Sequence, residues 1–210
     1  YNERLLRLLA ETQIPKVFLD TSSLVAPDEL NGDLLLMESR TSVRRITSHL
    51  LEQGRTLPGF IGDIGYAQSN RERYEGFCQA LTDAGKKVDS SLCLTTPLGI
   101  DTYREEIDTF LSSLSRMPDA FVCASDYVAC ILMQLLEKRG LRVPEDVAVS
   151  GFDNNTEDLL AEHLTTVQVF NEELGARLAL QILYRIKYPN TPHEITYLGT
   201  NVLYRDSTGD

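Results

Sequence analysis

Short apolar runs alternate along this chain with longer segments of helical period, and this alternation limits the fold more than any other feature. The apolar runs are candidate strands at residues 16–20, 34–37, 58–62, 88–94, 120–124, 147–152, 164–169 and 201–204. Most of them are short and rich in Val, Ile, Leu and Phe, as buried parallel strands are. Parallel strands need crossover connections, and the helical segments between them are suited to that role. The sequence therefore predicts an α/β fold with parallel sheets.

The expected helices have recognisable ends. They lie at residues 42–53, from residue 69 to Gly85, at 126–139 and at 172–187. Glycines suited to a left-handed turn follow the first three, and Pro189 follows the fourth. Residues 69–72, Ser-Asn-Arg-Glu, have the spacing of a capping box. In the last helix Leu174, Leu178, Ile182 and Ile186 align, and we expect this stripe to pack in a core.

Composition and charge exclude several classes of protein. The chain has 210 residues, of which 42% are hydrophobic and 24% charged, as expected for one domain or two small ones. Its 20 Lys and Arg against 31 Asp and Glu give a net charge of -11, so we expect this chain not to bind DNA or RNA by itself. No apolar run approaches the roughly 18 residues of a membrane span, and residues 1–6 lack the layout of a signal peptide.

Cysteines and histidines give no sign of a metal or redox centre. The four cysteines (Cys78, Cys93, Cys123 and Cys130) have no C-x-x-C spacing, which favours unpaired thiols in a reducing compartment. The three histidines form no H-E-x-x-H pair. A metal enzyme is therefore not expected, and no cofactor is implied.

Polar residues that follow the predicted strands are the candidates for a binding site. In an open α/β sheet a ligand binds beyond the carboxyl ends of the strands. This rule selects the following residues: Asp20, Tyr66, Ser69, Arg73, Ser125, Asp126, Asp153 and Asn154. Arginine can give two parallel donors, and a carboxylate accepts from adjacent hydroxyl or N–H groups. The set therefore suits a polyhydroxylated or heterocyclic ligand.

Structural roles compete with binding for several of these residues. Asp126 opens a predicted helix, so a role as N-cap or first-turn acid is favoured. A capping role is equally open for Ser69, and Asp20 could close a turn. For Asp153, which also stands at a strand end, a ligand-binding role is favoured over a role in a turn. Arg73 falls in the expected first turn of its helix, where the helix dipole opposes a cation. We therefore expect a buried carboxylate or a ligand to hold it there, and a ligand is favoured.

Several motifs, taken in order, resemble the effector-binding core of LacI/GalR-family transcriptional regulators. The resemblance rests on HLLEQG at 49–54, GFIG at 59–62, SNRERYEGF at 69–77, ASD at 124–126, GLRVPEDVAVSGFDN at 140–154 and LTTV at 164–167. The first three are similar to the family's HL-x-x-x-GH, IAFIGG and S-x-x-R-x-x-GF elements. The long run at 140–154 is the most specific of them.

The resemblance implies a fold of two α/β subdomains, as in periplasmic binding proteins, with the effector between them. An N-terminal subdomain would comprise residues 1–37 and 170–197, and a C-terminal subdomain residues 38–169 and 198–210. Carried over by motif, Arg73 and Asp153 would clamp the effector, and Asp20 and Ser69 would add polar contacts. Ser125 stands where relatives commonly have Asn, so its contact would be shorter or bridged by water.

This chain departs from the family's pattern in two further places, at residues 1–12 and at residues 55–56. Residues 1–12 resemble a helix well inside the N-terminal subdomain, so its first strands and the helix-turn-helix headpiece are expected to be absent from this chain. Arg55 and Thr56 follow Gly54, where relatives usually have histidine, and no function is attached to that change.

The leading hypothesis is therefore the effector-binding and dimerising core of a cytoplasmic regulator. Its effector would be a small polar molecule such as a sugar or sugar derivative, and its operator DNA would be bound only through the headpiece. An apolar helix face near residues 128–132 would serve either the homodimer interface or the core. The alternative is a periplasmic solute-binding protein for sugar transport, which a signal peptide upstream would distinguish.

An enzyme is not predicted. The chain lacks G-x-G-x-x-G, G-x-x-x-x-G-K-S/T and G-x-S-x-G motifs, and its paired acids, such as Glu105 and Glu106, are typical of solvated helix faces.

Overall fold

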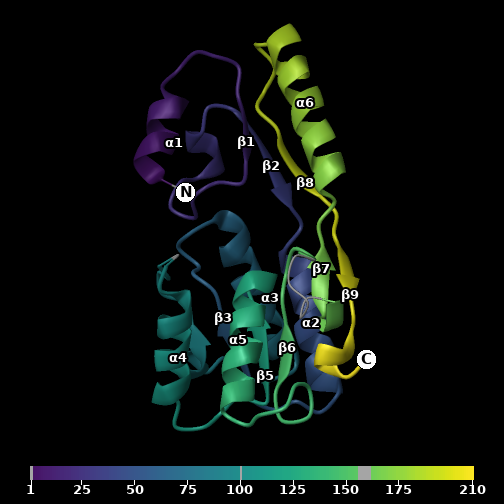
Figure 1. Cartoon of the computed structure of the whole chain (residues 1–210). Helices are drawn as coiled ribbons and strands as arrows, with labels where there is room; N and C mark the ends of the chain where they lie inside the picture. The colour runs from purple at the N-terminus through teal and green to yellow at the C-terminus, as the bar shows by residue number, and fades with distance from the viewer. Residues whose placement is uncertain (1, 100, 156–161) are drawn as a thin grey trace.

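The computed structural model describes residues 2–99, 101–155 and 162–210, whose elements form two lobes (Figure 1). We call the end of the molecule that contains both α1 and α6 the small lobe. Its elements are α1 (Glu3–Ala10), β1 (Val17–Leu19), η1 (Pro27–Glu29), β2 (Asp33–Met37), α6 (Asn171–Lys187) and β8 (Ile195–Leu198). Its core is separate from that of the other lobe and contains Leu6, Val25, Leu30, Leu34 and Leu36.

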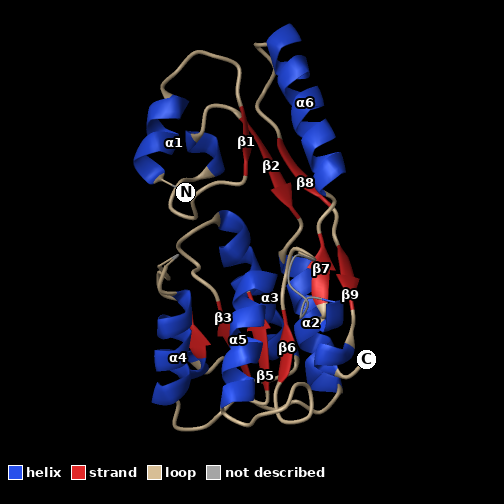
Figure 2. Cartoon of the chain, viewed as in Figure 1, coloured by secondary structure: helices blue, strands red, loops and turns tan. Residues whose placement is uncertain are grey.

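The large lobe contains the remaining elements (Figure 2). They are α2 (Arg40–Glu52), β3 (Pro58–Ile61), α3 (Gln68–Asp83), η2 (Ser90–Leu92), β4 (Cys93–Leu94), α4 (Tyr103–Ser113), β5 (Ala120–Cys123), α5 (Asp126–Lys138), β6 (Ala148–Ser150), β7 (Thr166–Gln168), β9 (Asn201–Leu203) and η4 (Asp206–Thr208).

Each lobe has its own parallel sheet. The small lobe has the strand order β1-β2-β8, and the large lobe has β4-β3-β5-β6. All neighbours in these two sheets are parallel, whereas β7 and β9 form a separate antiparallel pair. The predicted α/β fold with two parallel sheets is confirmed, and the antiparallel pair is an addition to it.

The helix ends largely follow the sequence signals. Gly54, Gly85 and Gly140 all have positive φ, between 68° and 91°, so the predicted left-handed helix stops are confirmed. Gly76 has a different role, because a Cβ atom there would lie 2.2 Å from the backbone oxygen of Arg40. Helices α2 and α3 therefore pack closely only because this position has no side chain.

The strand predicted at residues 88–94 is wrong over most of its length. Only Cys93–Leu94 pairs with β3. The Asp89 carboxylate accepts hydrogen bonds from the backbone N (3.0 Å) and Oγ (2.6 Å) of Ser91. These local bonds stabilise the 3-10 turn η2 in place of an extended chain.

The buried face of α6 also differs from the predicted apolar stripe. Its buried residues are Leu174, Gln181 and Arg185, whereas Ile186 from the predicted stripe is exposed. The polar residues are buried because Gln181 Nε2 and Arg185 Nε donate to the Asp33 carboxylate of β2, at 2.9 and 3.0 Å.

Two elements were absent from the sequence-based assignment. Strand β8 pairs with β2, but a threonine interrupts its sequence, Ile-Thr-Tyr-Leu, and none of its residues is buried, so it lacks the continuous apolar run of a buried strand. Helix α4 has two acids, Glu105 and Glu106, in its first turn and buries only Ile107 and Leu111.

Candidate functional site

The first turn of α3 contacts the small lobe through Asp20. Helix α3 begins at Gln68, and its N-cap residue Ala67 has no side-chain cap. Ser69 instead donates its hydroxyl to Asp20 Oδ2 at 2.5 Å and its backbone N–H to Asp20 Oδ1 at 3.3 Å. The predicted capping box is therefore wrong, because an aspartate from the loop after β1 satisfies this N–H in its place. Asp20 has a φ of 59°, a conformation that aspartate tolerates.

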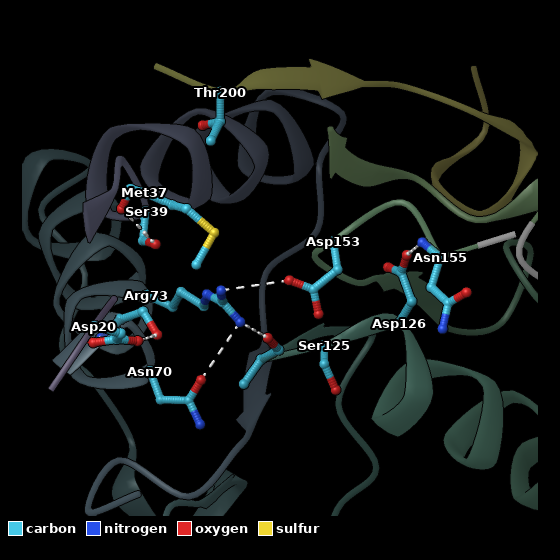
Figure 3. Close-up of polar contacts among 12 residues, drawn as sticks. Asp20, Met37, Ser39, Asn70, Arg73, Ser125, Asp126, Asp153, Asn155 and Thr200 are labelled. Carbon is cyan, nitrogen blue, oxygen red and sulfur yellow. Dashed lines mark hydrogen bonds and ion pairs between the residues drawn. The ribbon is translucent and has the colours of Figure 1, made fainter. Parts of the chain in front are cut away.

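Arg73 lies at the centre of the candidate site (Figure 3). Its Nη1 donates to the backbone oxygen of Ala124 and, at 3.4 Å, to Asn70 Oδ1. Its Nη2 lies 3.5 Å from Asp153 Oδ1, and its guanidinium carbon lies 3.6 Å from the centroid of the Phe152 ring. The site therefore combines a carbonyl, a carboxylate and an aromatic face around one cation.

The Arg73 guanidinium is both buried and incompletely paired. The residue is 5% exposed, and its Nε has no hydrogen-bond partner among the described residues. Burial lowers the pKa of Arg73, and the nearby acids, Asp153 first, oppose that change. Arg73 is the sixth residue of α3, so the expected position in the first turn is wrong and the dipole argument does not apply. A buried donor without a partner is costly, so the site favours an acceptor that reaches it.

Asp153 faces Arg73 from the loop after β6. Its backbone has a φ of 108°, which strains any residue other than glycine, and its N–H donates to Val167 O at 3.0 Å. Burial raises the pKa of the Asp153 carboxyl, and Arg73 partly offsets this. The side chain is 44% exposed, so its remaining oxygen lone pairs are accessible to a ligand.

Ser125 and Asp126 begin α5 next to Arg73. Ser125 is the N-cap residue, and its Oγ accepts the Val128 N–H at 3.3 Å. Asp126 is a first-turn acid, as favoured from the sequence, and it is buried. It accepts hydrogen bonds from Thr166 Oγ1 at 2.6 Å and from the Asn155 backbone N–H at 2.8 Å. Asp126 thereby fixes the loop that carries Asp153 to the start of α5.

The ionisation of Asp126 should make the free energy of unfolding depend on pH. Burial raises the pKa of its carboxyl to about 6, above its usual range near 4. A raised pKa means that ionisation favours the unfolded chain, so this group destabilises the fold as the pH rises from about 4 to 6. In urea unfolding, we expect Asp126→Asn to gain on the order of 2–3 kcal/mol relative to the wild type between pH 4 and pH 7.

The control for this measurement is Glu105→Gln, which removes an exposed acid of α4 and matches the change in net charge. If the stability difference between wild type and Asp126→Asn stays constant from pH 4 to pH 7, the assigned ionisation of Asp126 is wrong.

Residues at the chain connections between the lobes also lie at the candidate site, although they were not among the predicted site residues. Figure 3 shows Met37 and Ser39 close to Arg73, and Thr200 farther from it. Ser39 Oγ donates to Met37 O at 3.2 Å, and Thr200 Oγ1 donates to Glu38 O at 2.8 Å. Ser39 follows the predicted strand at 34–37 and so satisfies the strand-end rule, whereas Met37 is an apolar residue at the end of that strand. No signal in the sequence indicates Thr200, because β8 was not recognised.

The structure brings four of the predicted site residues into contact, two by two. Asp20 contacts Ser69, and Arg73 contacts Asp153. Ser125 lies next to Ala124, whose carbonyl binds Arg73. Tyr66 is exposed on the loop before α3, and Asn154 Nδ2 donates to Gln168 Oε1 at 2.5 Å.

Other kinds of site have little support in the part of the chain that the structure describes. It contains no group of three His, Cys, Asp or Glu residues arranged to hold a metal ion. Its helices are all too short or too polar to cross a membrane. None of the four cysteines forms a disulfide.

A family model described as a periplasmic binding protein-like domain matches residues 47–208. Among curated proteins, the HTH-type transcriptional regulator DegA of Bacillus subtilis is 31% identical over 170 residues. That match covers 80% of this chain and 48% of DegA. The chain spans between about half and three fifths of the length of curated relatives that it matches.

Solved structures show the same fold. A protein assigned to the LacI family of transcriptional regulators from Sanguibacter keddieii has a TM-score of 0.79 and 27% identity, covering 93% of this chain and 72% of its own. The complex of the transcriptional regulator CelR with cellobiose also has a TM-score of 0.79, with 26% identity, covering 98% of this chain and 69% of its own.

Proposed function

The chain belongs to the periplasmic binding protein-like domain family, in the form found in LacI-type transcriptional regulators, and we propose that it binds a small polar effector between its lobes. The observation that carries this proposal is Arg73, a buried cation with an unpaired Nε beside the half-exposed carboxylate of Asp153. A ligand with both acceptor and donor groups would satisfy the two side chains together.

The proposed ligand is a sugar or sugar derivative. Adjacent hydroxyl groups can donate to Asp153 and accept from Arg73, both on the large lobe, and an uncharged sugar ring would then lie between the two lobes. Asp20, Ser69 and Ser125 complete the proposed contacts. CelR, which matches almost the whole of this chain, is described in complex with cellobiose, and this supports a carbohydrate.

The proposed division of the chain places residues 1–37 and 170–197 in an N-terminal effector-binding subdomain. Residues 38–169 and 198–210 then form the C-terminal one. The boundaries fall near the connections from β2 to α2, from β7 to α6 and from β8 to β9, where the chain passes between the lobes in Figure 1.

The proposed biological role is regulation of transcription in the cytoplasm. The longer curated relatives are named as HTH-type regulators, which supports DNA binding through a segment outside this sequence. A ligand that binds one arrangement of the lobes better than another would shift their equilibrium and alter operator binding. We propose a homodimer for the working protein, because a dimer can contact two half-sites, and we propose no enzymatic activity.

A thermal-shift screen tests the ligand class. The panel contains pentoses, hexoses, disaccharides, sugar phosphates and nucleobases, followed by calorimetry on any compound that raises Tm. A ligand that binds only the folded protein must raise Tm. We expect stabilisation by a neutral sugar. Stabilisation by none of the sugars, or chemical turnover of a bound one, would refute the proposal.

A further inference from the structure

A hydrogen bond between a phenol and a carboxylate joins the two lobes. Tyr197, near the end of β8 in the small lobe, donates its Oη to Glu72 Oε1 of α3 in the large lobe, at 2.7 Å. Gln68, one turn earlier in α3, donates its Nε2 to the same oxygen at 3.2 Å. The Glu72 carboxylate thus receives one donor from each lobe.

The environment of Glu72 makes this bond important. Glu72 is 3% exposed, and in the described part of the chain no cation lies within ion-pair distance of its carboxylate. A buried carboxylate is stable only when hydrogen bonds replace the water it has lost. Tyr197 is 50% exposed, so water can reach this contact when the lobes separate. The Glu72 carboxylate therefore needs the hydrogen bond from Tyr197 while the lobes are together, whereas water can replace that bond when the lobes are apart.

We infer that Tyr197 and Glu72 form a latch that stabilises the closed arrangement of the lobes before any ligand binds. This inference rests on the proposed function, in which a ligand binds between lobes that open and close. Glu72 precedes Arg73 directly in α3, so the latch also holds the helical turn that carries Arg73 against the small lobe. Tyr197 and Glu72 are positioning residues and need not touch the ligand.

Two backbone amides report on the latch without a ligand. Gln68 N–H donates to Thr21 O at 2.8 Å and Ser69 N–H donates to Asp20 Oδ1 at 3.3 Å, and both acceptors belong to the small lobe. These amides become free to exchange when the lobes separate, whereas the amides of Phe77 and Ala80 lie deeper in α3. Hydrogen exchange at Gln68 and Ser69 therefore measures opening.

The test compares exchange in the unliganded wild type with that in Tyr197→Phe, Glu72→Ala and Glu72→Gln. Loss of a hydrogen bond to a buried carboxylate should favour opening about tenfold, so Tyr197→Phe and Glu72→Ala should exchange about tenfold faster at Gln68 and Ser69. Glu72→Gln keeps an acceptor oxygen for Tyr197 and should remain close to the wild type. Tyr188→Phe, which removes a phenolic hydroxyl beyond the C-terminal end of α6, is the control and should also match it.

Three results would overturn the latch: unchanged exchange at Gln68 and Ser69 in Tyr197→Phe, an equal acceleration at Phe77 and Ala80, or opening in Glu72→Gln as large as in Tyr197→Phe. The second would show general destabilisation, and the third would show that the charge and not the hydrogen bond holds the lobes. The exchange experiment uses no ligand, so a negative result would refute the latch without refuting the proposed effector site. Conversely, a ligand screen without a hit would refute the proposed ligand class but would not affect the exchange experiment.

Discussion

Arg73→Ala and Asp153→Ala are each expected to weaken effector binding by more than tenfold. Removing either side chain leaves a polar group of its partner, or of the ligand, buried without a hydrogen bond, which costs roughly 1–3 kcal/mol or more. Arg73 is the more severe change, because its guanidinium also contacts Ala124 O and the Phe152 ring. Calorimetry with the sugar that gives the largest thermal shift measures the loss.

Arg73→Lys separates charge from geometry. Lysine keeps the positive charge but cannot give two parallel donors or lie flat on Phe152 in the same way, so we expect binding well below the wild type. Arg44→Ala is the matched control, because Arg44 is an exposed arginine on α2 that pairs with Asp83 at 2.7 Å. It should leave affinity unchanged.

If Arg73→Ala fails to fold, Asp153→Ala can still test whether these two residues form the effector site. Asp153 is half-exposed, and its side chain contributes less than Arg73 to the interior of the large lobe. Unchanged affinity in folded samples of both alanine variants would refute the proposed site.

The contrast between α5 and α6 explains how much of the fold the sequence predicts. Helix α5 buries Val128, Ile131 and Leu132, which share one face at helical spacing, as the apolar pattern predicts. Helix α6 has equally clear apolar spacing, but it buries Gln181 and Arg185 because Asp33 lies opposite them. The burial pattern of α5 follows from the apolar spacing within that helix. The burial pattern of α6 depends on Asp33, which lies about 150 residues earlier in the sequence, and the spacing within α6 cannot indicate that residue.

The same distinction applies to the candidate site. The strand-end rule selects Asp20, Arg73 and Asp153 because parallel strands place their carboxyl ends along one edge. It does not reveal that Asp20 binds Ser69, since that contact depends on how the two lobes are placed. Tyr197 is not selected because the sequence does not predict its strand, β8. Glu72 lies between the selected residues Ser69 and Arg73, but its contact with Tyr197 also depends on how the two lobes are placed.

The buried ion pair of the small lobe should have the largest effect on stability. Asp33 accepts hydrogen bonds from Arg185, from Gln181 and from the Glu194 backbone N–H at 2.9 Å. Arg185→Met removes the cation and leaves this carboxylate buried, and breaking such a pair costs roughly 3–5 kcal/mol. We expect urea unfolding at pH 7 to show a loss of that size.

The pH dependence of that loss identifies its cause. Burial acts to raise the pKa of Asp33, but the hydrogen bonds from Arg185, Gln181 and Glu194 outweigh it, so the pKa is lowered overall. A lowered pKa means that Asp33 stabilises the wild type above its unfolded pKa, and that this stability is lost as the pH falls through the folded pKa. Without Arg185 the pKa of Asp33 should rise, so the gap between wild type and Arg185→Met should narrow as the pH falls below about 4.

Two further variants distinguish the loss of an ion pair from the loss of packing. Arg142→Met breaks an exposed pair with Asp146, 3.0 Å apart, and should have little effect because water screens it. The double variant Asp33→Leu/Arg185→Met removes both charges and should be more stable than Arg185→Met alone, since no charged carboxylate then remains buried without a cation. If the double variant is less stable than the single one, the packing of these side chains and not their charge holds α6 to β2.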